Sequence, residues 1–218
     1  MATAVVGGER WKFGVALARA GEVLRQEGVR SLWFKILGDT VYRRLLLLER
    51  PLQDPIPAVT VRIPVEISLL QKTQVAEYMA FRPEANEAEV RSQLEAGDWC
   101  FVVRHQGQIV CARWATVNPV WIDYLSCELR LAAGEIYSYD LFTKPEFRGH
   151  AISPFASAEM LRYFRTAGYR RIVAAISPEN SPSLRSVTKT GYRPYGLIGY
   201  VKIGPWKRHF YRVRNAPT

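Results

Sequence analysis

Cysteine and histidine are scarce in this sequence, with three of each among 218 residues. The cysteines form an odd set without a CxxC pair, and the histidines stand apart from them and from one another. This excludes a disulfide framework, and we predict no metal site. Long apolar runs are also lacking, because the longest candidate for a membrane span, residues 29–48, is interrupted by five charged side chains. The first residues, MATAVVGG, lack the pattern of a secretory signal, so we expect a cytoplasmic protein.

Acidic residues are few in one part of the chain. Residues 141–218 carry 14 basic and 3 acidic side chains, residues 51–140 carry 7 and 12, and residues 1–50 carry 9 and 5. The net charge of +10 is therefore concentrated in the last third. We expect no nucleic-acid partner, because a uniformly basic nucleic-acid binder would not have an acidic central segment such as residues 51–140. Ordinary solvated surface and a local anionic ligand both remain compatible with the basic excess.

The first fifty residues have apolar side chains at helical spacing in two stretches, residues 12–27 and 29–48. We predict two amphipathic helices there. The second mixes basic and aromatic residues, a combination that suits an anionic membrane surface. Three roles for residues 12–48 stay open: peripheral contact with the inner membrane surface, contact with a carrier protein, and packing on this chain or on a second copy in a homodimer.

Three prolines within residues 51–58 exclude a regular helix or a central strand there. We therefore predict a linker, which divides the chain into an N-terminal helical extension with its linker, residues 1–58, and a main domain, residues 59–218. The main domain has a mixed α/β pattern. Strands are expected at residues 59–63, 99–104, 109–117, 134–143, 171–176, 192–203 and 207–213, and helices at residues 68–81, 84–95, 154–166 and 182–189.

The segment from residue 141 to residue 160 carries the clearest chemical signal. A predicted strand leads through a short loop into a helix, with Ser153 at the N-cap position and Pro154 after it. Unpaired backbone N–H groups and the positive helix end make such a turn a binding place for anions. Arg148 precedes the turn and adds a side-chain cation suited to phosphate. A plain strand-to-helix turn with a surface arginine is the alternative.

Two motifs in this region resemble those of one family. TKPEFRGHAIS, residues 143–153, resembles the acyl-CoA-binding loop of the GNAT superfamily of N-acetyltransferases, with Ala151 and Ser153 at positions where the family pattern has glycine. ENSPSLRSVTKTGY, residues 179–192, is similar to a later helix of that family, which follows an asparagine and ends at a glycine. The two motifs stand in the expected order, separated by one helix and one strand. The resemblance covers roughly residues 59–213.

The resemblance implies an α/β (α+β) fold: a GNAT-like mixed, mostly antiparallel central sheet with splayed fourth and fifth strands, flanked by helices. Acetyl-CoA would be the co-substrate, lying between the splayed strands, here residues 134–143 and 171–176. Its pyrophosphate would bind the loop amides, and its pantetheine arm would bind the strand edge as an added strand does. The residues that the resemblance assigns to acyl-CoA binding are Leu141, Phe142, Thr143, Arg148, Gly149, His150, Ala151, Ile152, Ser153 and Asn180.

The resemblance also implies acetyl transfer to an amine within a ternary complex, which needs a base to take the amine proton. Glu135 stands where the histone-acetylating branch keeps its glutamate, and Asp140 matches a carboxylate common in other members. Because strand side chains alternate, the two should face opposite sides of an unbulged strand, and the choice stays open. Val187 occupies the place of the tyrosine that many members use to protonate the CoA thiolate. Ser183, which matches a serine of one branch, is the candidate proton donor instead.

Only charge indicates the acceptor. The acidic residues 51–140, which include Glu84, Glu87, Glu89 and Glu95, would suit a cationic amine. Two other functions stay open. One is a longer-chain acyltransferase that uses acyl-CoA or an acyl-carrier protein at a membrane surface. The other is a non-catalytic module of the same fold that binds an anionic partner through its basic face.

Overall fold

The structure is a computed structural model that describes residues 42–203 and 206–213. These residues fall into two compact units. The larger unit comprises residues 45–198 and 211–213, and the smaller unit comprises residues 42–44, 199–203 and 206–210. Every helix in the described residues belongs to the larger unit.

Eight strands form one mixed sheet in the order β10-β9-β1-β8-β7-β4-β3-β2, and two short strands pair separately. β7 and β8 run parallel, whereas β1 with β8, β2 with β3, β3 with β4 and β4 with β7 run antiparallel. The predicted mixed, mostly antiparallel sheet is therefore confirmed. The strands are β1 (Tyr42–Pro51), β2 (Glu66–Leu69), β3 (Trp99–His105), β4 (Gln108–Thr116), β5 (Val120–Ile122), β6 (Cys127–Leu129), β7 (Glu135–Thr143), β8 (Arg171–Ile176), β9 (Arg193–Ile203) and β10 (Trp206–Val213).

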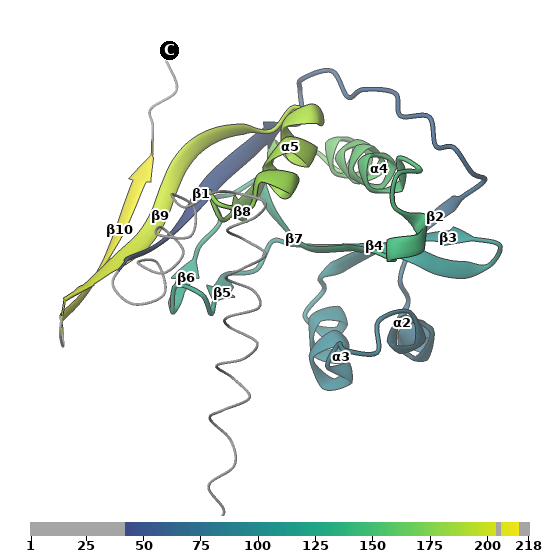
Figure 1. Cartoon of the computed structure of the whole chain (residues 1–218), viewed down its shortest axis with the longest axis horizontal. Coiled ribbons are helices and arrows are strands. Elements are labelled where there is room, and N and C mark those ends of the chain that lie inside the picture. The colour runs from purple at the N-terminus through teal and green to yellow at the C-terminus, as the bar shows by residue number, and fades with distance from the viewer. Residues whose placement is uncertain (1–41, 204–205, 214–218) are drawn as a thin grey trace, which may run out of the picture. The chain divides into compact units, whose positions relative to one another are not determined.

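Helices cover both faces of the sheet in the larger unit, with α4 on one face and α2 and α3 on the other (Figure 1). The α-helices are α2 (Val75–Phe81), α3 (Glu87–Glu95), α4 (Ile152–Thr166) and α5 (Ser181–Lys189), and two short 3-10 helices are η1 (Lys72–Gln74) and η2 (Pro145–Phe147). None of the helices within the described ranges is both long and apolar enough to span a bilayer.

β4 lies in the middle of this arrangement and is buried at every position after Gln108. Trp114 donates its Nε1–H to the hydroxyl oxygen of Tyr78 on the α2 side at 3.0 Å. The next residue, Ala115, packs with Met160 and Phe164 of α4 on the other side. A strand buried on both faces reads as a continuous apolar run, which is how the sequence predicts it. β4 and the strands beside it therefore form the rigid frame on which the larger unit is built.

The prediction of a helix over residues 29–48 is wrong from residue 42 onward, because residues 42–51 form β1. β1 pairs antiparallel with β8, with Leu46 opposite Ile176 and Pro51 opposite Arg171. A short run of leucines supplies a helical stripe and a buried strand equally well, so periodicity does not separate the two. Residues 45–51 thus lie in the sheet of the larger unit and not in a helical extension. Residues 1–41, with the rest of the two predicted helices, lie outside the described residues.

Two further predictions near the start of the main domain need correction. Residues 59–63 form no strand, and the first strand after the proline-rich segment is β2. The helix predicted from residue 68 starts only at Val75, after the short 3-10 turn η1. Leu69 and Leu70 fit the helical pattern, but Leu69 ends the edge strand β2 and pairs with Phe101. The other predicted strands and helices of the main domain are present, with ends shifted by a few residues.

The smaller unit is held by aromatic contacts. The rings of Tyr42 and Phe210 stack with centroids 5.8 Å apart, and the ammonium of Lys207 lies 4.2 Å from the centroid of the Tyr200 ring. Gly199 is required by close packing, because a Cβ atom at this position would lie 2.2 Å from the carbonyl oxygen of Arg43. Any side chain there would force the neighbouring backbone apart.

Candidate functional site

β7 and β8 separate partway along their length. Their parallel pairing is confined to residues 135–137 of β7 and 171–173 of β8. Beyond it, β8 continues along β1, while β7 continues along β4. A cavity of about 670 Å³ lies at this fork, lined by β4, β7, β8, the loop before α4, the first turn of α4, and α5 with the loop before it. The splayed pair of strands that the resemblance implies is therefore present.

A β-bulge in β7 shapes the cavity wall. Ala112 pairs with Phe142 and Trp114 pairs with Tyr139, so Asp140 and the residue after it face the single residue between them on β4. Asp140 has a backbone φ of +42°, in the left-handed region that aspartate tolerates better than most residues. The extra residue reverses the alternation of side chains from this point on. The unbulged strand assumed from the sequence is not what forms.

Most of the predicted site residues meet at this cavity. The loop motif and the helix motif, which lie about thirty residues apart in the sequence, both contribute to its lining. Those that line it are Asp140, Leu141, Phe142, Thr143, Arg148, Ser153, Asn180 and Ser183. Those that do not are Glu135, Gly149, His150, Ala151 and Ile152.

The loop before α4 offers backbone donors, although its residues 149–152 do not line the cavity. Ile152 is buried in a core cluster with Val103 and Val110. The helix begins two residues earlier than predicted, with Ala151 as the N-cap residue at a φ of +62°, so Ser153 does not cap it. The backbone N–H groups of residues 149–153 have no hydrogen-bond acceptor among the described residues. Such a set of free donors at a helix N-terminus is suited to an anion.

Ala151 carries a strained backbone, and this allows a test of the loop geometry. A left-handed conformation is unfavourable for alanine and free of strain for glycine. We expect Ala151→Gly to raise the free energy of unfolding, measured in urea, by up to about 1 kcal/mol. The matched control is Ala158→Gly in the buried interior of α4, which we expect to destabilise by about 1 kcal/mol or more. Equal effects of the two changes would contradict the left-handed N-cap.

Asp140 is held in an ion pair on the α2 side of the sheet. Its Oδ2 accepts a hydrogen bond from Nη1 of Arg82, the residue that ends α2. The guanidinium of Arg82 lies 5.2 Å from the centre of the Phe142 ring. Burial of Arg82 lowers its pKa, but the hydrogen bond that it donates to Asp140, the charge of that carboxylate and the contact with Tyr78 together outweigh burial and raise the pKa of Arg82. Asp140 therefore presents an oriented carboxylate at the cavity.

Glu135, the other candidate base, does not line the cavity and is held in an ion pair. Its Oε1 accepts from Nε of Arg171 at 2.8 Å, and its Oε2 accepts from the backbone N–H of Ala132 at 2.9 Å. Arg171 also bonds Glu49 of β1. Glu135 starts β7, five residues and roughly 16 Å of extended strand from Asp140. Its carboxylate ties β7 to β8 where they still pair, so the structure keeps it out of the cavity.

The helix motif contributes a polar wall. The side chain of Asn180 caps α5 by accepting a hydrogen bond from the N–H of Ser183 at 3.1 Å. Ser183 and Ser186 line the cavity with their neighbour Val187, which is buried. α5 thus supplies hydroxyl groups, and Val187 adds an apolar contact where a tyrosine stands in the family pattern.

Arg113 is a cavity residue that the sequence predictions did not single out. It lies on β4 opposite the bulge and is only 4% exposed. Its Nε donates to Ser138 Oγ at 2.7 Å, and its Nη1 donates to Ser157 Oγ on α4. The signal was available in the sequence, because a single charged residue interrupts an otherwise apolar strand.

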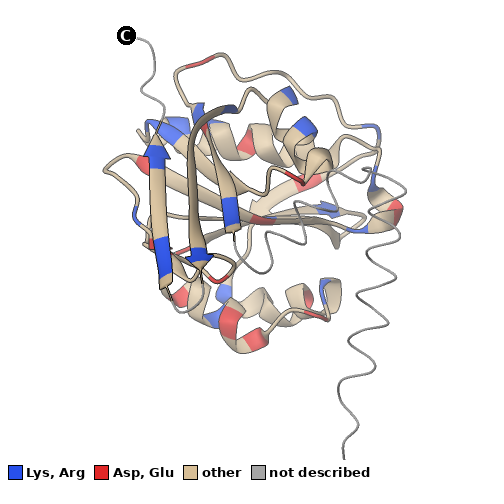
Figure 2. Ribbon diagram, turned by 60° about the vertical axis from the view of Figure 1, so that its left-hand side comes forward, with Lys and Arg blue, Asp and Glu red and all other residues tan. Residues whose placement is uncertain are grey.

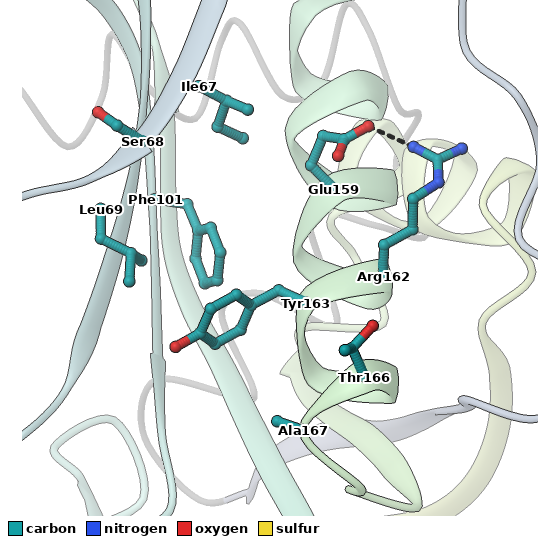
Figure 3. Close-up of a pocket in the computed structure, with 9 residues that line it drawn as sticks. All are labelled: Ile67, Ser68, Leu69, Phe101, Glu159, Arg162, Tyr163, Thr166 and Ala167. Atoms are coloured by element: carbon teal, nitrogen blue, oxygen red, sulfur yellow. Dashed lines mark hydrogen bonds and ion pairs between the residues drawn. The ribbon is translucent and has the colours of Figure 1, made fainter.

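A second cavity of about 610 Å³ lies between β2, β3 and α4 (Figure 3). Its wall is largely apolar, and the ring of Tyr163 packs edge-on against Phe101. Its charged residues, Glu159 and Arg162, bond each other. No predicted site residue lines it. The cavity at the fork is therefore the candidate site.

No protein-family model matches the sequence, and no curated protein does. Solved structures do match the fold. One is a glucosamine N-acetyltransferase region of a fungal multi-domain β-N-acetylglucosaminidase, with a TM-score of 0.54 at 14% identity, covering 81% of this chain and 22% of that chain. Another is a protein from Novosphingobium aromaticivorans assigned to the GNAT family of acetyltransferases, with a TM-score of 0.51 at 17% identity, covering 72% of this chain and 63% of that chain. With its splayed strands and bulged β7, the chain has the GNAT fold, that of a superfamily of N-acetyltransferases.

Proposed function

We propose that this protein is an acyl-CoA-dependent N-acyltransferase that uses the cavity at the fork of β7 and β8. The observation that carries the proposal is that two sequence motifs, one in the loop before α4 and one on α5, line a single cavity. The GNAT fold supports the same reaction class. The transferred group is acetyl in the simplest case.

The lining fits the parts of an acyl-CoA molecule. Arg148 is exposed at the loop, beside the free backbone N–H groups of residues 149–153, and together they suit the pyrophosphate. Beyond residue 137, the edge of β7 that faces β8 has no partner strand in the described part of the chain. Its backbone N–H and C=O groups suit the amide groups of the pantetheine arm.

The reaction joins an amine to the acyl group. The lone pair of the amine nitrogen attacks the thioester carbonyl carbon, a C–N bond forms, and the C–S bond breaks with the electron pair going to sulfur. We assign Asp140 as the base that takes the amine proton, directly or through one water molecule. We assign Ser183 as the group that gives a proton to the thiolate, and solvent then reprotonates its oxygen. Arg82 keeps the carboxylate of Asp140 oriented.

For the acceptor we propose a cationic amine. Acidic side chains gather on α3 and the loop before it, on the face of the sheet where Asp140 meets Arg82 (Figure 2). Complementary charge raises the local concentration of a cationic substrate and helps to orient it. The test is a panel of amines assayed for thiol release from acetyl-CoA. If only neutral or acidic amines are turned over, the proposal of a cationic acceptor is wrong.

Calorimetry with free CoA and acetyl-CoA tests the proposed function directly. Binding of both, followed by thiol release when an amine is added, is the expected result. No detectable heat at millimolar ligand would end the proposal. Binding without thiol release from any amine or acyl donor would favour the non-catalytic module.

Removing the cation at the loop should weaken this binding. We expect Arg148→Ala to raise the Kd for free CoA about tenfold, because hydrogen bonds to a charged group contribute roughly 1.5–3 kcal/mol. The matched control is Arg130→Ala, an exposed arginine that bonds Glu128 and does not line the cavity. An equal loss of affinity in the two variants would mean that Arg148 contributes only to the net charge.

A further inference from the structure

Three charged side chains line the cavity at the fork: Arg113, Asp140 and Arg148. Asp140 is matched by Arg82, and Arg148 is exposed at the loop that suits phosphate. Arg113 is 4% exposed, so it is the most buried of the three. It is the charged residue of the lining that has no role in the proposed function.

Arg113 has only neutral partners in the described part of the chain. Its Nε and Nη1 donate to the hydroxyls of Ser138 and Ser157, and it forms no ion pair there. Its Nη2 makes no hydrogen bond with the described residues and is not fully enclosed. A buried guanidinium without an anion is costly, and proteins pair such charges or use them for a ligand. The carboxylate in the lining, that of Asp140, forms its ion pair with Arg82 instead.

A second buried group nearby also lacks a partner. The hydroxyl of Tyr192 is fully enclosed and has no hydrogen-bond partner within residues 42–203 and 206–213. Burial raises the pKa of Tyr192, with the positive charges of Arg113 and Arg50 acting against that rise, so the hydroxyl stays protonated at neutral pH. The region around Arg113 therefore holds a cation and a neutral donor and has no acceptor with a negative charge among the described residues.

The bulge of β7 separates Arg113 from Asp140. The two face each other across the β4–β7 pair, but the side chain of Arg113 reaches Ser157 of α4, whereas Asp140 reaches Arg82 after α2. An acyl group at the bulge would thus have the base on one side of the sheet and a buried cation on the other. A short acyl chain that leads away from the base would point its far end toward Arg113.

We propose that the acyl group carries a free carboxylate and is the half-thioester of a short dicarboxylic acid, such as malonyl or succinyl, whose carboxylate binds Arg113. This inference rests on the proposed function and narrows its donor. The carboxylate supplies the anion that the described residues do not, and guanidinium and carboxylate bind in paired, directional hydrogen bonds.

The first test is calorimetry on the unaltered protein with succinyl-CoA, butyryl-CoA and free CoA. Succinyl and butyryl have the same chain of four carbons and differ in the terminal carboxylate. We expect succinyl-CoA to bind at least tenfold more tightly than butyryl-CoA. Equal binding, or tighter binding of butyryl-CoA, would overturn the inference and leave the proposed function standing. If free CoA does not bind either, the proposed function itself fails.

The second test is Arg113→Gln, which keeps hydrogen-bond donors and removes the charge. We expect the preference for succinyl-CoA over butyryl-CoA to disappear while the affinity for free CoA changes less than twofold. A folded variant that keeps the preference would refute the role of Arg113. If the affinities for free CoA and for succinyl-CoA fall by the same factor, Arg113 binds the thiol end of CoA and not the acyl carboxylate. The comparison in the unaltered protein stands even if this variant fails to fold.

Discussion

Replacing Asp140 by Asn is expected to lower kcat by roughly 10²–10⁴-fold, the usual contribution of a general base, with the same acyl-CoA donor and amine. The amide cannot take a proton from the amine, so attack on the thioester would have to wait for the rare neutral amine to arrive from solvent. The affinity for free CoA should stay unchanged, because the carboxylate of Asp140 bonds Arg82 on the α2 side of the sheet, whereas the pyrophosphate is assigned to the loop before α4.

Asparagine is the right substitution because it preserves the bulge. Asp140 sits at a φ of +42°, and asparagine is among the residues that best tolerate the left-handed region. The amide oxygen can still accept the hydrogen bond from Arg82, so the side chain keeps its orientation. An alanine would remove the hydrogen-bond acceptor of Arg82 and would also favour a change of the backbone away from the left-handed conformation. A loss of rate could then come from the missing base, from a displaced Arg82 or from an altered strand.

The matched control is Glu135→Gln on the same strand. Glu135 bonds Arg171 where β7 and β8 still pair, so its change should lower stability and leave kcat within about twofold. If Asp140→Asn keeps more than half of the activity while Glu135→Gln loses it, the assignment of the base is reversed. If both variants keep full activity, the amine loses its proton to another group or to solvent.

The strands and helices of the main domain could be predicted because their apolar patterns are long and separated by turn residues. β3 and β4 flank the turn at residues 105–108, and α4 ends at Thr166, two residues before Gly168, which has a φ of +82°. β1 could not be predicted, because four consecutive leucines fit a helix stripe and a buried strand alike. What makes them a strand is pairing with β8, more than a hundred residues later, and no local pattern contains that information.

The site could be predicted as a set of residues and only in part as a geometry. The two motifs identified Arg148, Ser153, Asn180 and Ser183 as site residues, and these four line one cavity. The choice between the two carboxylates depended on the ion pair of Glu135 with Arg171, a contact between distant strands that no local pattern contains. The bulge that sets the backbone of Asp140 is a single extra residue, which alternation along a strand cannot reveal. Arg113 belongs to no motif. The sequence marks it as a charge within an apolar strand, and the structure adds that it is buried without an anionic partner in the part of the chain that is described.

The stability of the cavity wall depends on another buried arginine, Arg50 on β1, which is 3% exposed. Its Nε donates to the carbonyl oxygen of Thr190 at 2.9 Å, just after α5. Its Nη2 donates to the carbonyl oxygen of Pro55 at 2.6 Å, and its Nη1 bonds Asp54 at 3.1 Å. Gly191 allows this approach, because a Cβ there would lie 2.9 Å from Nε of Arg50. One guanidinium thus joins β1, the proline-rich segment and the end of α5.

We therefore expect Arg50→Met to lower the free energy of unfolding by about 3–5 kcal/mol, because methionine keeps much of the side-chain volume but leaves buried carbonyl groups and a carboxylate without a donor. The midpoint of thermal unfolding should fall by roughly 6–20 °C. The matched control is Arg91→Met on α3, whose exposed pair with Glu87 should contribute no more than about 0.5 kcal/mol. Similar losses in the two variants would show that the network around Arg50 adds nothing to the fold.

Arg50→Met should also affect the candidate site, because Arg50 bonds the end of α5. Thr190 closes the helix that carries Asn180 and Ser183, so losing its bond to Arg50 frees one end of the cavity wall. Well below the unfolding temperature, Arg50→Met should therefore weaken binding of free CoA and increase amide hydrogen exchange in residues 181–190, while exchange in α3 stays unchanged. Unchanged exchange in α5, with stability lowered as expected, would mean that β1 and the proline-rich segment depend on Arg50 and the cavity wall does not.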